Sequence, residues 1–326
     1  MIDNHNTHTN GEKKMLAAME RTFGIELEIA LDEPSDLATH LTGNGFNTHV
    51  ENYNHETRSH WKIVSDGSVS GRDANGNYLG GYELVSPILK GEDGLAQARR
   101  VCELLNTYPG ALVVNRTCGF HVHVQIDDLT LKQFKNCAKA QLKYEWVLDQ
   151  LVPLSRRYNA ETQRDNNEYC ATVAGRFGDR QNLRSIEETG FSLIDSASNM
   201  DRLKRMLQSH RQTKWNLVNF SNRGTIEIRQ GAGTVDPDKV CNWVLLWTSF
   251  FSGFADARLR ASKLHHEKTN TNNSNGNLTF DKALRRMFKH IRTPDGEINR
   301  PLRKFFQKRQ KELAALATRR DAARSY

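Results

Sequence analysis

Short stretches of alternating polar and apolar residues occur between residues 21 and 254, separated by longer stretches with apolar residues three and four apart. Side chains alternate between the two faces of a strand, whereas a helix repeats a face every three or four residues. The alternation predicts strands at 22–31, 61–64, 82–86, 112–114, 120–126, 215–220 and 225–230. The longer spacing predicts helices at 92–105, 130–151, 200–211, 239–257, 280–291 and 301–320.

These elements do not follow a regular strand–helix alternation, which favours an α+β fold with a mostly antiparallel sheet. Residues 1–20 are polar and rich in His and Asn, so we expect them to be disordered. Residues 21–261 then form the main domain, in which 171–211 is an insertion without a motif. Residues 262–326 are predicted to be an Asn- and Thr-rich linker followed by a basic helical extension.

Several predicted strands place acid or imidazole groups on one face and aliphatic groups on the other. In the first strand, for example, Glu26 and Glu28 share a face, and Ile25, Leu27 and Ile29 share the opposite one. Together the polar faces carry Glu26, Glu28, Glu83, His121, His123, Glu227 and Arg229. Any antiparallel sheet with one solvated face alternates in this way. The unusual feature here is the concentration of glutamate and histidine.

Carboxylates that lie close together repel one another unless a cation compensates their charge. Carboxylate and imidazole groups are ordinary ligands for Mg²⁺ or Mn²⁺. An arginine beside them suits an anionic oxygen, such as that of a transferring phosphoryl group. If the strands are neighbours, the pattern therefore predicts a metal-bound nucleotide on one face of the sheet.

The bulk composition fits a polar globular protein, with a mean hydropathy of −0.67. No apolar run approaches the roughly 20 residues that a membrane span needs, so we expect no membrane association. The five cysteines show no CxxC spacing. This usage predicts a reduced protein in the cytoplasm, without a disulfide framework or zinc ribbon.

The positive charge of the chain is concentrated near its C-terminus. Residues 281–326 hold 14 lysines and arginines and 5 aspartates and glutamates, a net charge of +9, against +8 for the whole chain. Such a segment could contact nucleic acid through counterion release. It could equally be a solvated helical face.

Six motifs in order resemble the amidoligase family of the glutamine synthetase and glutamate–cysteine ligase superfamily. They are residues 23–28 (FGIELE), 66–68 (DGS), 82–87 (YELVSP), 118–124 (CGFHVHV), 155–159 (SRRYN) with 169–170 (YC), and 224–229 (GTIEIR) followed by 233–236 (GTVD). The likeness extends from about residue 23 to residue 251. Each motif alone is weak, but their order and spacing are specific.

The resemblance implies a curved, funnel-shaped antiparallel sheet with helices packed on its outer face, and an enzyme that joins a carboxylate to an amine. ATP and Mg²⁺ or Mn²⁺ would be required, with an acyl-phosphate intermediate. The substrates would be small-molecule, peptide or protein carboxylates and amines. The implied metal ligands are Glu26, Glu28, Glu83, His121 and Glu227. Arg229 would stabilise the transferred phosphate and, with Glu28 and Glu227, serve catalysis. His123, Arg156 and Arg157 would bind the nucleotide or a substrate carboxylate.

Two other functions remain open at this point. His-x-His on a strand is also found in zinc sites, so a metal-dependent hydrolase is one alternative. The remaining histidines fall in predicted loops, the linker or the C-terminal segment, which disfavours it. The other alternative is a non-catalytic protein that binds nucleic acid through residues 281–326.

Overall fold

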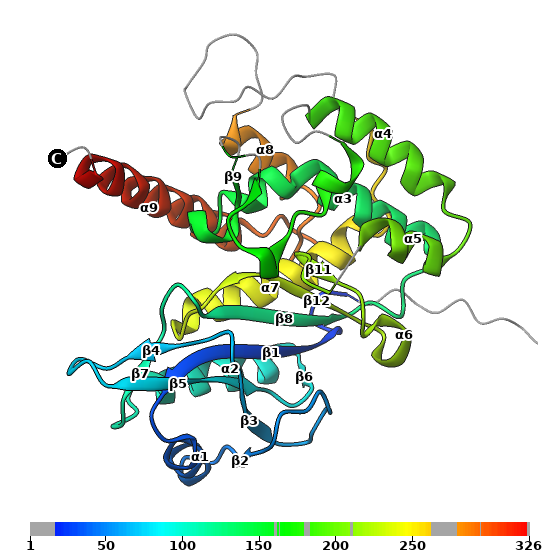
Figure 1. The fold of residues 1–326 in the computed structure, drawn as a ribbon. Helices are drawn as coiled ribbons and strands as arrows, with labels where there is room; N and C mark the ends of the chain where they lie inside the picture. Colours follow the sequence, from blue (N-terminus) through cyan, green and yellow to red (C-terminus); the bar gives the residue numbers. More distant parts are fainter. Residues whose placement is uncertain are drawn as a thin grey trace, which may run out of the picture.

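The computed structural model describes residues 17–159, 162, 164–178, 183–208, 211–261, 279–293 and 295–324. Residues 1–16 of the segment predicted to be disordered lie outside these ranges, as do residues 262–278 of the predicted linker. Figure 1 shows the large sheet toward the lower part of the molecule and most of the helices above and behind it.

One open sheet organises the described chain, with the strand order β11-β12-β8-β1-β5-β3-β2 and with β4, β6 and β7 paired at its margins. The strands are β1 (Thr22–Leu31), β2 (Thr48–Val50), β3 (Trp61–Ser65), β4 (Gly71–Arg72), β5 (Tyr78–Val85), β6 (Leu89–Lys90), β7 (Leu112–Val113), β8 (Gly119–Gln125), β11 (Trp215–Asn216) and β12 (Thr225–Ala232). Neighbouring strands are antiparallel, except that β2 and β3 are parallel. The predicted α+β class with a mostly antiparallel sheet is confirmed.

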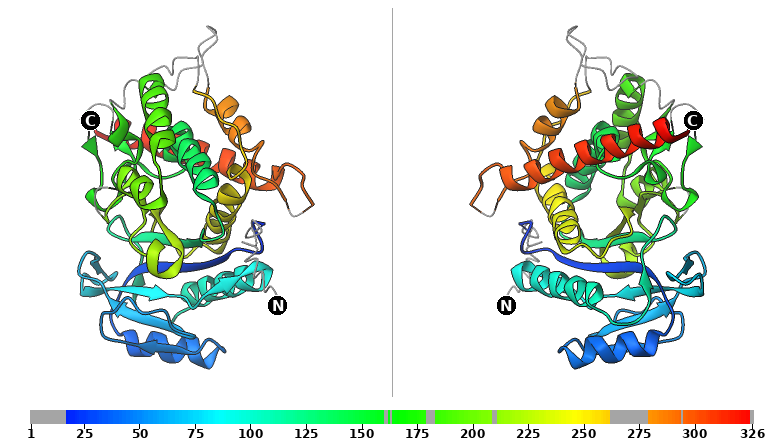
Figure 2. Two further views of the ribbon diagram at one scale, coloured as in Figure 1. Left: turned by 90° about the vertical axis from the view of Figure 1, so that its right-hand side faces the viewer. Right: turned by 90° about the vertical axis from the view of Figure 1, so that its left-hand side faces the viewer.

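The helices cover the apolar face of the sheet and extend beyond it (Figure 2). They are α1 (Pro34–Gly43), α2 (Gly91–Asn106), α3 (Leu131–Asp149), α4 (Leu183–Ser196), α5 (Met200–Leu207), α6 (Phe220–Arg223), α7 (Pro237–Phe254), α8 (Phe280–Met287) and α9 (Arg300–Arg324). Short 3-10 turns and a small hairpin, β9 (Tyr158–Asn159) with β10 (Arg164–Asp165), connect α3 to the insertion. Among the described helices, none is both long enough and apolar enough to cross a membrane.

The period-two pattern places one side of each central strand in the hydrophobic core. Ile25, Val122 and Ile228 on β1, β8 and β12 are fully buried. They pack in one cluster with Trp247 and Phe250 of α7. Burial of such side chains contributes roughly 1.5–3 kcal/mol each. Because the apolar side chains of these strands point into the core, the glutamates and histidines between them must lie on the opposite face of the sheet.

The strand predicted at 215–220 is wrong beyond residue 216. The chain turns after β11 and forms the short helix α6, which ends at Gly224 in the left-handed conformation with φ 65°. Within the insertion, α4 and α5 pack against α3. The described residues of α4 and α5 line neither of the two cavities described below.

The basic C-terminal segment forms α8 and α9. Leu302 and Phe306 in the first turns of α9 are buried and attach this helix to the core. The ring of Phe306 lies 6.1 Å from that of Trp243. The later turns extend away from the rest of the molecule (Figure 1). Lys304, Lys308 and Lys311 are exposed along this helix. Nucleic-acid contact through residues 281–326 stays a prediction.

Gly81 on β5 allows the turn that follows β3 to lie directly across the sheet. A Cβ atom at Gly81 would lie 2.2 Å from the carbonyl oxygen of Val69 and 2.3 Å from that of Asp66. No side chain fits at this distance without displacing the turn. The same turn carries Asp66, whose backbone N–H donates to Gly81 O at 2.9 Å.

We expect Gly81→Ala to destabilise the protein by about 1–3 kcal/mol, the usual cost of overpacking. Chemical denaturation followed by circular dichroism measures this change. Gly67→Ala in the same turn is the matched control, since a Cβ atom there meets nothing within 4 Å. Equal stability of the two variants would contradict the proposed close approach.

Candidate functional site

The register of four adjacent strands brings the predicted polar residues together. Glu26 on β1 lies opposite His121 on β8, and Glu28 lies opposite Glu83 on β5. On the other side of β8, Glu227 of β12 lies opposite His123. Residues directly opposite one another in a sheet have Cβ atoms about 5 Å apart. One patch of the sheet therefore holds four glutamates and two histidines.

The imidazole of His121 is the centre of this patch. Its Nδ1 lies 3.1 Å from Glu26 Oε2 and 3.5 Å from Glu227 Oε1, and its Nε2 lies 3.2 Å from Glu28 Oε1. The side chain is only 1% exposed. Glu26 and Glu28 belong to β1 and Glu227 to β12, so this histidine of β8 contacts three carboxylates from the two strands beside it and fixes their relative positions.

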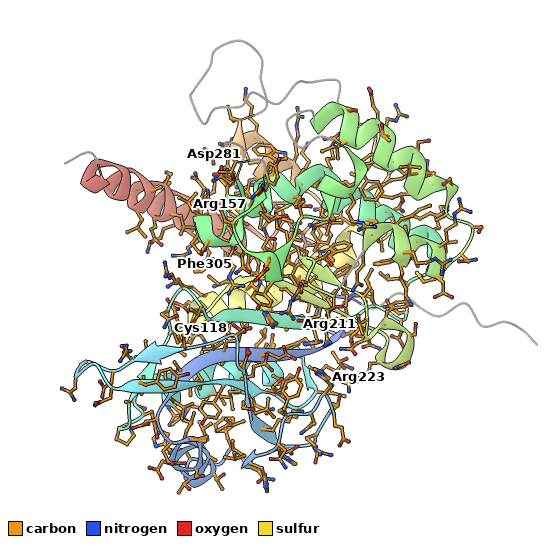
Figure 3. All side chains as sticks on the ribbon, in the orientation of Figure 1. Cys118, Arg157, Arg211, Arg223, Asp281 and Phe305 are labelled. Atoms are coloured by element: carbon orange, nitrogen blue, oxygen red, sulfur yellow. The ribbon has the colours of Figure 1, made fainter. Side chains whose placement is uncertain are left out.

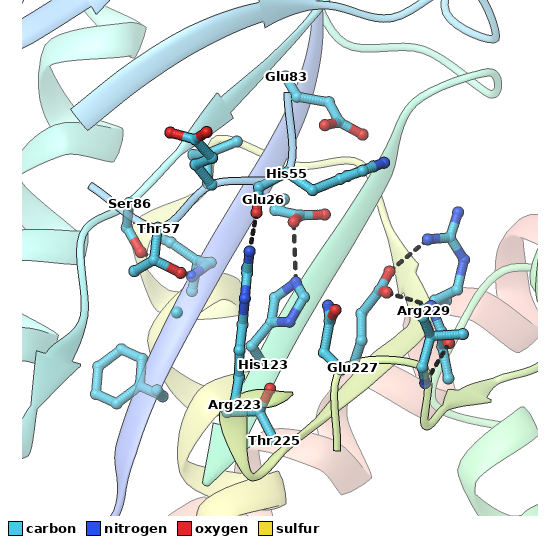
Figure 4. Close-up of a pocket in the computed structure, with 18 of the residues that line it drawn as sticks. Glu26, His55, Thr57, Glu83, Ser86, His123, Arg223, Thr225, Glu227 and Arg229 are labelled. Carbon is cyan, nitrogen blue, oxygen red and sulfur yellow. Dashed lines mark hydrogen bonds and ion pairs between the residues drawn. The ribbon is translucent and has the colours of Figure 1, made fainter. Parts of the chain in front are cut away.

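A second group of contacts surrounds Glu227. Asn216 donates its Nδ2 hydrogen to Glu227 Oε2 at 2.6 Å, and the Arg229 guanidinium donates to Glu227 Oε1. His123 Nε2 lies 2.9 Å from Glu26 Oε1 (Figure 4). Arg229 also donates from Nε to the carbonyl oxygen of Tyr169 at 3.2 Å. Arg229 thus joins the sheet to the segment that follows β10.

Gly119 makes the tight convergence beside Glu28 possible. A Cβ atom there would lie 2.9 Å from His121 Nε2 and 3.1 Å from both Glu28 Oε1 and Arg156 Nη2. The Gly119 N–H also donates to Glu28 Oε2. A larger residue would push apart the acid, the imidazole and the guanidinium.

The pKa values in the patch move in opposite directions. Burial by itself would raise the pKa of Glu26, but His123 and His121 together hold it well below its usual value. Burial, followed by the charges of Glu26, Asp66, Glu28 and Glu227, raises the pKa of Glu83 to about 9. One carboxyl is therefore kept protonated by the negative charge around it.

This excess of negative charge fits the binding of divalent cations. The described residues contain three groups in which the possible ligand atoms all lie within 4.8 Å of one another. These groups are Glu26 with His123 and Glu227, Glu26 with Glu83 and His121, and Glu28 with Asp66 and Glu83. The ligand atoms are mostly carboxylate oxygens, which hard cations such as Mg²⁺ and Mn²⁺ prefer. A cation there would compensate the repulsion that keeps Glu83 protonated.

Two cavities meet at the patch. The larger, of about 590 Å³, is lined by Glu26, Glu83, His123 and Glu227, among others. The smaller, of about 380 Å³, is lined by Glu28, His121, Arg116 and Arg156, among others. Ser68, Tyr169 and Arg229 line both. The cluster of acids and imidazoles therefore lies between two spaces of the size that small ligands occupy.

The two neighbouring arginines of the SRRYN motif have different surroundings. Arg156 is 3% exposed, lines the smaller cavity and donates to the carbonyl oxygen of Cys118 at 2.6 Å. Arg157 lines neither cavity and lies away from Cys118 in Figure 3. Its guanidinium donates to Val152 O at 2.7 Å and to Gln150 Oε1 at 3.4 Å. We therefore do not include Arg157 in the candidate site.

Several residues that the structure places here had no role in the prediction from sequence. Asp66 belongs to the candidate cation-binding group with Glu28 and Glu83. It lies in a turn, where the alternation of a strand cannot predict which way a side chain points. Its DGS motif was the available clue. Asn216 orients Glu227 from an adjacent strand, and Lys62 and Arg116 line the cavities. These positions become visible only when strand neighbours are known.

The fold and the site together define an α+β protein with an acid- and imidazole-lined sheet face between two cavities. A family model described as "Putative amidoligase enzyme" matches residues 19–251. The chain belongs to this amidoligase family, and its coarse class is that of a ligase-type enzyme.

Two further comparisons add context. No curated protein matches the chain in sequence. Among solved structures, the cryo-EM structure of Plasmodium falciparum glutamine synthetase aligns with a TM-score of 0.41 and 9% sequence identity. The alignment covers 92% of this chain and 73% of that one. The family assignment rests on the family model.

The raised pKa of Glu83 predicts how pH affects stability when divalent metal is removed. The unfolded chain loses this proton near pH 4.5, whereas the folded protein keeps it to about pH 9. Stability in EDTA should therefore fall as pH rises from about 5 to about 9, by at most about 1.4 kcal/mol per pH unit. Glu83→Gln, which does not titrate, should show a weaker fall in thermal-unfolding scans.

Mg²⁺ or Mn²⁺ should raise the melting temperature of the wild-type protein at pH 8 more than that of Glu83→Gln. Glu297→Gln, at an exposed position outside both cavities, is the control and should behave as wild type. If Glu83→Gln and the wild type showed the same pH dependence, Glu83 would not be the protonated carboxyl.

Proposed function

We propose that this protein is an ATP- and divalent-metal-dependent ligase that joins a carboxylate to an amine through an acyl phosphate. The observation that supports this most directly is the position of the acid and imidazole cluster between two cavities. Such a site can present a nucleotide from one side and an acid from the other to the same group of side chains.

The chemistry explains why the site needs its charges. A carboxylate is a poor acyl donor, because its leaving group would be oxide. Transfer of the γ-phosphoryl group of ATP to the carboxylate gives ADP and an acyl phosphate. The amine then attacks the acyl carbon, and phosphate leaves as the amide forms. Such transfers depend mostly on positioning and charge neutralisation.

Glu26, Glu28, Glu83, His121 and Glu227 would hold the divalent cations, with Asp66 as an additional ligand. When bound, the cations would neutralise phosphate charge. The Arg229 guanidinium, shared by both cavities, would stabilise charge on the transferring phosphoryl group. His123 lies in the wall of the larger cavity, where it would contact the nucleotide. Arg156 would orient an anionic oxygen of the substrate in the smaller cavity.

The larger cavity is the better candidate for the nucleotide. It combines the charged patch with apolar lining residues such as Pro87 and Ile88, which suit a nucleobase. The smaller cavity is more polar and carries three guanidinium groups, from Arg116, Arg156 and Arg229. It suits the carboxylate substrate.

We expect Glu28→Gln and Glu227→Gln each to lower ATP-dependent amide formation by roughly 10²–10³-fold or more, because each removes a carboxylate that would hold the divalent cations that neutralise the transferring group. The assay is amine-dependent release of ADP with Mg²⁺ or Mn²⁺, across pooled carboxylate and amine candidates. Circular dichroism should show an unchanged fold.

Glu297→Gln, an exposed position outside both cavities, is the control and should keep wild-type activity. Full activity of both Glu28→Gln and Glu227→Gln would count decisively against this site.

The hydrolase alternative fits the site less well. In the described cation-binding groups, at most one histidine joins two carboxylates, and no cysteine contributes. Zinc sites are usually richer in nitrogen or sulfur ligands. Bound zinc, together with hydrolysis that needs no ATP, would favour the hydrolase over the ligase.

A further inference from the structure

The connection between β2 and β3 crosses the face of the sheet that carries the site. These strands are parallel, with Thr48 opposite Trp61 and Val50 opposite Ile63. The chain must therefore return along the sheet before β3 begins, a path that a helix usually takes. Residues 51–60, which we call the strap, contain neither helix nor strand. Residues 53–57 of the strap line the larger cavity.

Lys62 attaches the strap to the sheet. Its Nζ donates to Asn54 Oδ1 at 2.7 Å, to Glu56 O at 2.8 Å and to Asn54 O at 3.1 Å. These acceptors match the three hydrogens of an ammonium group. The residue is 3% exposed, lines the same cavity and forms no ion pair within the described chain. All three hydrogen bonds of this buried ammonium group therefore attach the strap to β3.

The strap also has its own internal order. The carboxylate of Glu51 accepts hydrogen bonds from His60 Nε2 at 2.9 Å, Asn54 Nδ2 at 2.9 Å and Arg58 Nε at 3.1 Å. The bond from His60, with those from Asn54 and Arg58, lowers the pKa of Glu51 to about 2 against the effect of burial. The strap is thus held in one shape by its own side chains.

The middle of the strap also contacts the helix that connects β11 to β12, on the other side of the sheet. Arg223, the last residue of α6, donates from Nη2 to the carbonyl oxygen of His55 (Figure 4). Because α6 connects β11 to β12, strands β8, β1 and β5 lie between this contact and Lys62 on β3. The middle of the strap is therefore held from two sides of the site face, by Lys62 of β3 at Asn54 and Glu56 and by Arg223 of α6 at His55.

We propose that the strap is the outer wall of the larger cavity, and that Lys62 and Arg223 are the positioning residues that hold it over bound nucleotide. This inference rests on the function proposed above. The two attachments differ in strength. Lys62 is buried and makes three hydrogen bonds, whereas Arg223 is exposed and makes one to the strap. The nucleotide enters when the Arg223 contact opens and the Lys62 attachment stays.

The test compares the full-length wild type with Lys62→Met and Arg223→Ala. Calorimetry measures the Kd for Mg²⁺-bound ADP, and hydrogen exchange measures protection of amides 51–60. We expect the Kd to rise by about tenfold or more for Lys62→Met and by roughly three- to tenfold for Arg223→Ala, with Arg223→Lys closer to wild type. Protection of the strap should fall in both variants, while that of β1 and β8 is unchanged.

Two matched controls should leave the Kd unchanged. Lys90→Met replaces an exposed lysine of the same sheet, and Arg72→Ala removes a similar bond from an exposed arginine to a carbonyl oxygen, that of Gly76. Neither residue lines the larger cavity. If Lys62→Met does not fold, Arg223→Ala and Arg223→Lys decide the question.

The outcomes separate the two hypotheses. An unchanged Kd in Lys62→Met and Arg223→Ala, with wild type that binds Mg²⁺-bound ADP, would overturn the role of the strap and leave the ligase proposal standing. A wild type that binds no nucleotide would overturn the proposed function and with it the strap as a nucleotide wall. A higher Kd with unchanged strap protection would also overturn the inference, since the effect would not act through the strap.

Discussion

The structure around the site depends on the repulsion among carboxylates that four adjacent strands bring to one place. Antiparallel register puts Glu28 opposite Glu83 and leaves Glu26 beside both histidines. Burying like charges is costly unless hydrogen bonds and opposite charges compensate them. His121, Asn216 and the Gly119 N–H supply part of this compensation, for Glu28 and Glu227. Glu83 remains protonated because its burial and the neighbouring carboxylates raise its pKa. The arrangement of the patch costs folding energy and agrees with the proposed cation site.

The same constraint explains the small residues near the patch. Carboxylates and imidazoles can share one cation only if their backbones approach closely, and side chains would prevent this approach. Gly119 lets Glu28, His121 and Arg156 converge, and Gly81 lets the turn with Asp66 lie beside Glu83. Each glycine stands within one or two residues of a glutamate or histidine of the site. This geometry explains Gly119 within the CGFHVHV motif and Gly81 directly before the YELVSP motif.

Strand periodicity was sufficient to predict the polar faces of β1, β8 and β12, because alternation is a local property. The sequence did not show that these strands are neighbours or in which register they pair. That information came only through the family resemblance. Asp66 lies in a turn, and Lys62 lies between two apolar residues on β3. The environments of Arg156 and Arg157 differ because of tertiary contacts. None of these placements has a periodic signal, so local pattern could not find them.

A face that carries so many acids also limits what can cover it. An apolar helix of the kind that packs on the opposite face would bury the glutamates without partners, which is unfavourable. The covering element must instead be polar, and it must be able to move so that ligands can enter. The strap meets the first condition, since Lys62, Arg58 and Arg223 bring cations to its carbonyl and carboxylate groups. The proposed opening of the Arg223 contact would meet the second. The parallel pairing of β2 and β3 is then explained, because only a crossover connection brings the chain back over the site.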